Sequence, residues 1–242
     1  MSRGLGDVYK RQGAILAGCL SFYIVLGKEK INLSLIPMKE LISAYKESLS
    51  LFVSLLSTQI YVNVNKLVIG SFLGMSEVSI YDMAEKVSLL IKLPVSMMGQ
   101  AVFPKISRER NVCFVNRVMF LVAGIVSLAY VVLFVYSGWI VYLFTGEYIE
   151  VASLIIRLLG VSAILVSFNN FLGGNRLIPF GYSSVYMRVM VANCLFFLAS
   201  TGLLWMTENI NIYTVTVMTV AVEGFCLVTL LYKDWRLNLL KL

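Results

Sequence analysis

The chain has 242 residues, of which 59% are hydrophobic and only 14% are charged, and its net charge is +7. This balance lies far outside that of soluble proteins and predicts a polytopic membrane protein. The basic residues are scattered among short loops and do not gather on one face, which argues against nucleic acid as a partner.

The side chains that most often carry chemistry are absent or badly placed. The chain contains no His, which excludes Ser-His and Cys-His nucleophile pairs and His-based metal sites. Its four cysteines lie in or beside apolar segments without a Cys-x-x-Cys spacing, so we interpret them as small buried apolar side chains. We therefore expect no metal, no cofactor and no enzymatic activity.

Residues 1–12 differ from the rest of the chain because they are polar and carry Arg3, Lys10 and Arg11. A signal peptide is not favoured, since further spans follow in place of a soluble domain. The string GDVYKRQ resembles adapter-derived sequence, and we interpret this segment as a non-native tail on a fragment of a longer protein. Residues 13–46 are predicted to form a short span, 13–27, and a cytoplasmic connection with an amphipathic interfacial helix at 38–45.

The next part of the chain, residues 47–105, contains two apolar segments of membrane length, 48–70 and 81–104, which predict a transmembrane hairpin. Each carries polar residues three or four positions apart, a spacing that places them on one helical face. They are Gln59, Asn63 and Lys66 in the first segment, and Asp82, Glu85, Ser88, Lys92, Ser96 and Gln100 in the second.

The two polar rows match when the hairpin is folded about a turn near residue 75. The pairs are then Lys66 with Glu85, Asn63 with Ser88, and Gln59 with Lys92. Such groups either hold two helices together or mark a wet pathway, since an ion at mid-membrane costs an apparent ~2.5–3.5 kcal/mol. Mutual pairing leaves Lys86 and Lys92 against only Asp82, so we predict a net positive hairpin interior that lines a cavity.

Four more spans are predicted over residues 114–137, 151–172, 189–206 and 212–232. The fold class is therefore all-α: a polytopic bundle of about seven transmembrane helices, with residues 47–242 forming a six-helix lobe. Arg157 lies within a span, and Glu223 lies near the middle of the last one. Glu223 is interpreted either as a cavity ion or, with slight preference, as a partner for a neighbouring helix. The Asn- and Gly-rich patch at 169–175 predicts a helix break.

The distribution of charge among the loops predicts the orientation. Most of the 20 Lys and Arg residues fall in the connections after residue 27, at 105–117, at 176–188 and after residue 232. In the loops on the other side all charged residues are acidic: Glu77, Glu147, Glu150 and Glu208. By the positive-inside rule, the C-terminus is cytoplasmic.

Residues 47–108 resemble the seventh and eighth helices of bacterial polysaccharide-export flippases. The likeness rests mainly on LVIGSFLG (67–74), YDMAEK (81–86) and QAVFPKISR (100–108). FTGEYIEVASLIIRLLGVSAI, from Phe144, resembles the connection of the ninth and tenth helices, and Glu223 falls where the last helix of this group often has a Glu. The family is the O-antigen flippase group of the multidrug/oligosaccharidyl-lipid/polysaccharide (MOP) superfamily.

This resemblance implies the second half of a twelve-helix transporter in the bacterial inner membrane. Such a protein moves an undecaprenyl-diphosphate-linked oligosaccharide outward through a cleft between two lobes, with alternating access and ion coupling. Its partners would be the lipid bilayer, the lipid-linked oligosaccharide and the N-terminal lobe absent from this sequence. The substrate and cavity residues would be Gln59, Asn63, Lys66, Glu85, Lys92 and Gln100, with Asp82, Ser88, Arg157 and Glu223 as secondary candidates.

Other classes of function stay open at this point. A polysaccharide polymerase or ligase would be expected to have a long outside loop with Arg or His, whereas the outside loops here are short and acidic. An accessory membrane subunit would not require matched polar rows. Within the superfamily, a multidrug extruder or a peptidoglycan-precursor flippase is the alternative, although a net positive hairpin favours an anionic cargo.

Overall fold

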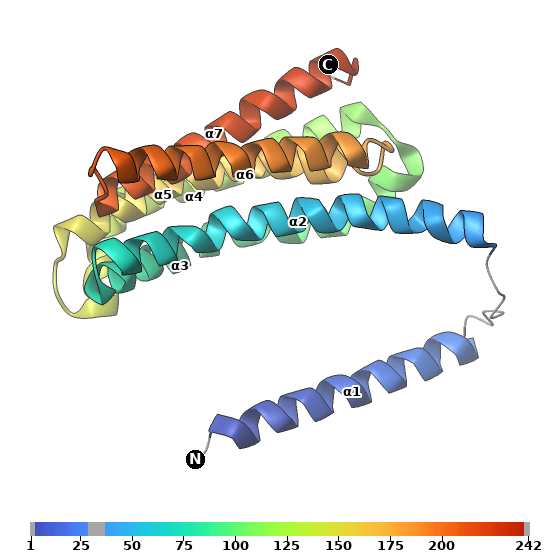
Figure 1. Cartoon of the computed structure of the whole chain (residues 1–242), viewed down its shortest axis with the longest axis horizontal. Coiled ribbons are helices and arrows are strands. Elements are labelled where there is room, and N and C mark those ends of the chain that lie inside the picture. The colour runs from blue at the N-terminus through green and yellow to red at the C-terminus, as the bar shows by residue number, and fades with distance from the viewer. Residues whose placement is uncertain (1–2, 29–36, 240–242) are drawn as a thin grey trace. The chain divides into compact units, whose positions relative to one another are not determined.

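A computed structural model describes residues 3–28 and 37–239, and no β-strand occurs in these ranges (Figure 1). Long helices suit a chain in lipid, where every backbone N–H and C=O must find its partner within the segment. The helices are α1 (Arg3–Lys28), α2 (Met38–Phe72), α3 (Met75–Glu109), α4 (Val112–Thr145), α5 (Glu150–Asn169), the π-helix η1 (Asn170–Leu177), α6 (Ser183–Met206) and α7 (Ile212–Arg236).

Two compact units make up the chain, residues 1–44 and residues 45–242. The first contains α1, whose apolar side chains such as Ile15 and Leu20 are exposed. The second contains most of α2 and all later helices. The predicted tail is helical from Arg3, and much of the predicted connection, residues 29–36, lies outside the described residues.

Within residues 3–28 and 37–239, six helices are long and apolar enough to cross a membrane: Ser48–Phe72, Met75–Glu109, Val112–Thr145, Glu150–Leu177, Ser183–Met206 and Ile212–Arg236. The span expected at 13–27 corresponds to a shorter apolar stretch, Ile15–Ile24, within α1. The polytopic helical fold class is confirmed, and the protein is a multi-pass membrane protein.

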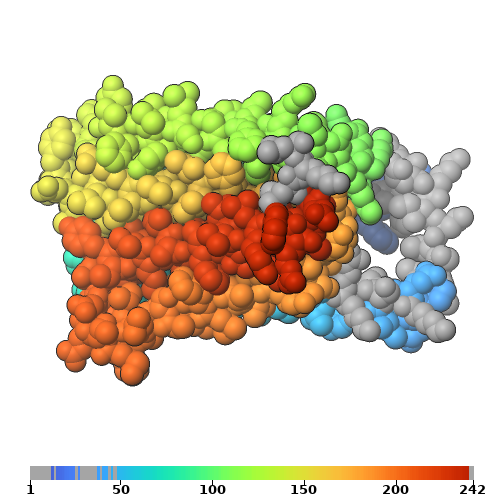
Figure 2. Space-filling view, turned by 90° about the horizontal axis from the view of Figure 1, so that it is seen from above, coloured from blue at the N-terminus to red at the C-terminus, as the bar shows by residue number. Residues whose placement is uncertain are grey.

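In the second unit α5 lies at the centre of the bundle. It packs against α3, α4 and α7, and α6 packs against α7. Figure 2 shows α4, α5, α7 and α6 in this order across one face. The close approach of α4 to α5 requires a residue without a side chain, because a Cβ added at Gly160 would lie 2.6 Å from the Tyr130 ring.

The ends of two helices differ from the sequence expectation. The separate interfacial helix expected at 38–45 is wrong, since α2 runs unbroken from Met38 to Phe72. The second arm starts at Met75 and not at residue 81, after Gly74 with a φ of 100° that favours glycine. Lys92 is therefore the middle residue of the 35-residue helix α3.

The expected helix break at 169–175 is also wrong, because the chain stays helical and widens into the π-helix η1. The buried Asn175 amide donates to Oδ1 of Asn170 at 2.8 Å, and both side chains lie against Gly99 of α3. Gly173 lies against the Tyr186 ring, at 2.6 Å from an added Cβ. Close packing on both sides thus accompanies the wider helical turn, a feature that is frequent at functional sites.

Candidate functional site

A cavity of about 270 Å³ lies inside the helix bundle of the second unit. Its walls come from five α-helices and the start of the π-helix η1, and many of the lining side chains are polar. The polar ones are Thr58, Tyr61 and Asn65 of α2; Tyr81, Glu85, Ser88 and Lys92 of α3; Asn169 and Asn170 at the α5–η1 junction; Tyr186 of α6; and Thr219 and Glu223 of α7.

The carboxylate of Glu223 organises one wall of this cavity. Glu223 lies near the middle of α7 and is 7% exposed. Tyr61 donates its hydroxyl to Oε1 of Glu223 at 3.3 Å, and the Asn169 amide donates to Oε2 at 2.8 Å and to the Glu223 backbone carbonyl at 3.1 Å. Glu223 therefore joins α2 and α5 to α7 and also borders the cavity.

One turn earlier on α7, Thr219 makes a second polar junction. Asn65 donates to its hydroxyl oxygen at 3.1 Å, and the Tyr81 hydroxyl lies 3.4 Å from the same oxygen. Three buried oxygens at the cavity have no hydrogen-bond partner among the described residues: Oδ1 of Asn65, Oγ of Ser88 and Oδ1 of Asn169. They can accept hydrogen bonds from water or from another donor that enters the cavity.

Lys92 supplies the positive charge of the cavity. Within the described chain, no carboxylate lies within the 4.0 Å ion-pair distance of its ammonium group, although Glu223 and Glu85 interact with it electrostatically over a longer range. Two cavity-lining neighbours, Val62 and Leu89, are exposed. The cavity therefore reaches the surface between α2 and α3, and Lys92 is one of the residues that line it.

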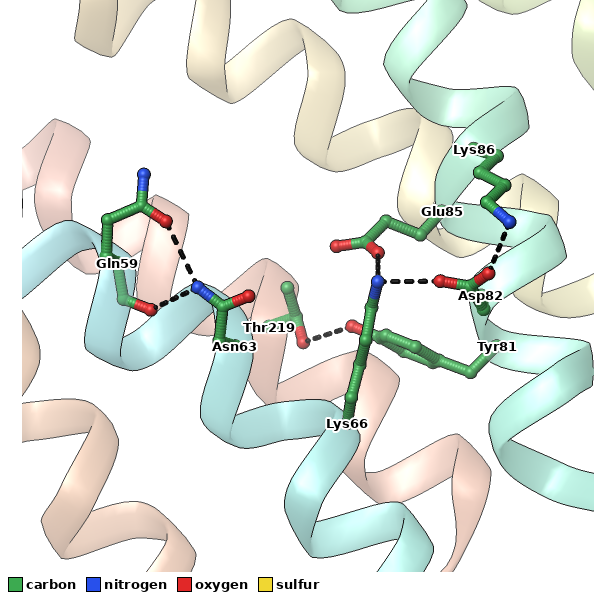
Figure 3. Close-up of polar contacts among 8 residues, drawn as sticks. All are labelled: Gln59, Asn63, Lys66, Tyr81, Asp82, Glu85, Lys86 and Thr219. Atoms are coloured by element: carbon green, nitrogen blue, oxygen red, sulfur yellow. Dashed lines mark hydrogen bonds and ion pairs between the residues drawn. The ribbon is translucent and has the colours of Figure 1, made fainter. Parts of the chain in front are cut away.

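The charged cluster at the α2–α3 contact is already paired (Figure 3). The Lys66 ammonium lies 2.5 Å from Glu85 and 2.7 Å from Asp82, and Asp82 also pairs with Lys86 at 2.6 Å. The Lys66–Glu85 pair agrees with the hairpin register expected from the sequence. This cluster glues two helices together, which was the simpler of the two interpretations of Lys66.

The other two pairs of the expected register, Asn63 with Ser88 and Gln59 with Lys92, are not formed. Asn63 is exposed and donates to Gln59 on its own helix, both to the backbone carbonyl at 2.8 Å and to the side-chain oxygen at 3.0 Å (Figure 3). Its expected partner Ser88 is buried and lines the cavity. Gln59 is exposed and lies outside the cavity lining that contains Lys92.

The structure thus places the residues singled out from the sequence in four different surroundings. Glu85, Ser88, Lys92 and Glu223 line the cavity. Gln59, Asn63 and Gln100 are exposed, and Lys66 and Asp82 belong to the paired cluster. Arg157 faces α4, where its Nε donates to the Ser137 hydroxyl at 2.7 Å.

Sequence reasoning missed Tyr61, Asn65 and Thr219 and took Asn169 only as part of a helix break. A signal was present, since Tyr61 with Asn65 and Thr219 with Glu223 are two polar pairs at the same i, i+4 spacing. On α2 this second row continues through the buried Ser54 and Ser57. It was overlooked because hydroxyl groups and tyrosines stand out less in an apolar segment than lysine and glutamine.

A second buried polar cluster lies at the end of the bundle where α7 finishes. Arg176 of η1 and Asp234 of α7 are both fully buried and form an ion pair at 2.8 Å. Arg176 also donates to the side chain of Asn116 on α4 and to the backbone carbonyl of Leu239. The guanidinium of Arg176 thus connects three helices, η1, α4 and α7, and the segment after α7.

The chain is similar in sequence to known proteins. The family model described as "Polysaccharide biosynthesis protein" matches residues 9–109. A protein of Shigella dysenteriae named "Putative O-antigen transporter" is 24% identical over 190 residues, which cover 74% of this chain and 46% of that protein. The chain thus spans about half the length of this curated relative. No solved structure matches the chain.

The two matches cover different lengths of the chain but agree in kind. Their descriptions concern polysaccharide biosynthesis and O-antigen transport. The chain is therefore similar to proteins of polysaccharide biosynthesis and O-antigen transport, in agreement with the resemblance to polysaccharide-export flippases noted in its sequence.

Proposed function

We propose that the chain forms part of a flippase that moves an undecaprenyl-diphosphate-linked oligosaccharide across the bacterial cytoplasmic membrane. The family supports a transporter, and the curated relative is named for O-antigen. The observation that carries the proposal is Lys92, an ammonium at the midpoint of a membrane helix with no carboxylate at ion-pair distance among the described residues.

The cargo route that we propose runs along the hairpin surface and not through the cavity. Pockets for drug-sized ligands measure about 300–1,000 Å³, so a cavity of about 270 Å³ is too small for a lipid-linked oligosaccharide. By contrast, Gln59 and Asn63 are exposed within a membrane span, where polar groups face a wet cavity or another protein segment. We propose that this face borders a cleft completed by a second lobe of the transporter.

In this scheme Lys92 contacts the diphosphate of the cargo. An isolated charge at mid-membrane is costly unless it meets an opposite charge, and Glu85, the nearer acidic residue on its helix, is already held by Lys66. The opening of the cavity between Val62 and Leu89 gives the ammonium access to the hairpin face. An anionic headgroup there would supply the missing charge, and the cation would lower the cost of its passage.

The test is a pair of substitutions at Lys92 in cells whose surface polysaccharide depends on the transporter that contains these helices. Lys92→Gln should reduce export by roughly tenfold or more, the equivalent of about 1.4 kcal/mol, whereas Lys92→Arg should retain most of it. Export is measured as glycan at the cell surface relative to transporter in the membrane.

The matched control is Lys86→Gln, which removes a cation from the same helix. Lys86 has a side chain that is 72% exposed and pairs with Asp82, so export should change little. If export survives Lys92→Gln at a normal membrane level, Lys92 does not contact the cargo and the proposal for this residue is wrong.

We further propose that the C-terminus is cytoplasmic in the inner membrane. The α2–α3, α4–α5 and α6–α7 connections lie at one end of the bundle and contain no Lys or Arg between the helices (Figure 1). Reporters fused after Ser76, Glu147 and Glu208 should therefore give a periplasmic signal. A fusion after Arg110 serves as the control and should read cytoplasmic. A cytoplasmic signal from any of the first three would contradict this orientation.

A further inference from the structure

A second cavity, of about 260 Å³, lies at the end of the bundle where α6 begins and α7 finishes. It shares no residue with the central cavity. Its lining consists of Val185 and Arg188 of α6, Lys233 and Arg236 of α7, and Leu237 directly after α7. We call this cavity the basic pocket, because three of these side chains are cationic and none is acidic.

The cations of the basic pocket have no acidic partner among the described residues. In the described parts of the chain, no carboxylate lies within ion-pair distance of Arg188, Lys233 or Arg236. Asp234 is adjacent in sequence, but it is fully buried and paired with Arg176. Arg188 donates its Nε to the Ser184 carbonyl at 3.2 Å, and its terminal nitrogens have no bond within the described chain. The pocket therefore presents unpaired donors to whatever enters it.

The surroundings of the basic pocket are those of a membrane–water interface. Trp235 is 67% exposed and Tyr232 is 49% exposed, and the cationic groups of Lys233 and Arg236 each lie 5.8 Å from the Tyr232 ring centre. Exposed Trp and Tyr are typical of the headgroup level. Towards its middle, α7 exposes the apolar side chains Val228 and Leu231. The three cations of the basic pocket therefore lie at the interfacial end of a helix whose exposed surface is apolar further in.

We propose that the basic pocket binds the phosphodiester headgroup of an anionic phospholipid. Guanidinium groups recognise phosphate through paired N–H donors, and basic pockets between membrane helices suit lipid headgroups. This lipid would be a structural ligand and not the transported cargo, so the proposal is independent of the function of Lys92. A soluble phosphate shares the charge but makes no use of the aromatic and apolar surface beside the pocket.

Trp235 provides a local reporter for this lipid. The chain has three tryptophans, and Trp139 and Trp205 lie near the ends of α4 and α6 at the opposite end of the bundle. The double variant with Trp139→Phe and Trp205→Phe keeps Trp235 as its single tryptophan. This double variant is the parent protein for the fluorescence measurements. It is reconstituted into phosphatidylcholine vesicles that contain rising fractions of brominated phosphatidylglycerol or of brominated phosphatidylcholine. Bromine quenches the fluorescence of tryptophan on contact, so the half-quenching fraction measures relative affinity.

We expect half-quenching of the parent at a fraction of brominated phosphatidylglycerol that is at least about fivefold lower than that of brominated phosphatidylcholine. Each cation near an anionic lipid contributes about fivefold. The triple variant Arg188→Gln, Lys233→Gln and Arg236→Gln should lose this preference. The control triple Lys105→Gln, Arg108→Gln and Arg117→Gln removes the same amount of charge from exposed positions at the same end of the bundle. This control should keep the preference for phosphatidylglycerol. Equal quenching by brominated phosphatidylcholine in all three proteins checks their insertion.

Two results would overturn the proposal. The first is a parent without preference, or a preference that persists in the pocket triple variant. The second concerns the source of the phosphate, and it is tested by thermal unfolding in inorganic phosphate, with chloride at equal ionic strength as the control. Suppose that the parent shows no lipid preference, and that phosphate raises the thermal midpoint of the parent but not that of the pocket triple variant. The pocket then binds a soluble anion, and the lipid assignment is wrong.

Discussion

Replacing Asp234 by Asn is expected to lower the stability of the protein more than any other single change considered. The substitution leaves the Arg176 guanidinium charged, fully buried and without its carboxylate. Removing one partner of a buried ion pair costs about 3–5 kcal/mol, because the remaining charge stays uncompensated. For a chain of this size that corresponds to a fall of roughly 6–20 °C in thermal midpoint. The midpoint is measured on purified protein by loss of helical circular dichroism.

Two further variants separate the charge effect from general damage. Arg176→Met combined with Asp234→Leu removes both charges and should recover much of the loss, since apolar replacement of a buried pair is often neutral. Arg236→Gln, two residues from Asp234 but exposed, should change the midpoint little. If Asp234→Asn has the same thermal midpoint as the unmodified protein, the Arg176–Asp234 ion pair does not stabilise the contact of η1 with α7.

The second large effect is expected at Glu223, where stability and the charge of the cavity depend on one side chain. Glu223→Ala removes the acceptor of the Tyr61 hydroxyl and one of the two acceptors of the Asn169 amide. A buried donor left unpaired costs about 1–3 kcal/mol. Glu223→Gln keeps an oxygen acceptor and should cost less. Thermal midpoints of the two variants give this comparison directly.

The electrostatic part of the role of Glu223 is tested by a double-mutant cycle with Lys92. Each single change to Gln leaves the other group with an unbalanced charge beside the cavity, whereas the double change removes both. The double variant should therefore be more stable than the sum of the single effects predicts. The cycle of Glu223→Gln with Lys86→Gln is the control and should be additive, because Lys86 is exposed. Additivity in the Lys92 cycle would mean that these two charges do not interact.

These two clusters lie at different levels of the bundle and use α7 in different ways. Glu223 connects the middle of α7 to α2 and α5, whereas Asp234 connects its end to η1. A loosening of the Arg176 cluster would free the end of α7 without breaking the contacts of Glu223. The stability variants at Asp234 and the cavity variants at Glu223 therefore probe separate contacts of the same helix.

The sequence by itself determined the class of the protein and the approximate positions of the six membrane-length helices between residues 48 and 236. Long apolar runs such as residues 118–146 are local features, and their length relates directly to the thickness of a bilayer. The pairing of Lys66 with Glu85 was also accessible, because a short turn limits the ways in which two consecutive helices can face each other. The resemblance to the flippase group rested on the same local segments.

Tertiary structure alone decided which polar groups meet in the interior. Helical periodicity gives α2 two polar rows, Gln59 with Asn63 and Tyr61 with Asn65, and it does not fix the rotation of the helix about its axis. The structure turns Tyr61 and Asn65 inward because Glu223 and Thr219 offer them partners more than 150 residues later in the chain. The widening at η1 and the Arg176–Asp234 pair depend in the same way on distant contacts, which no local pattern encodes.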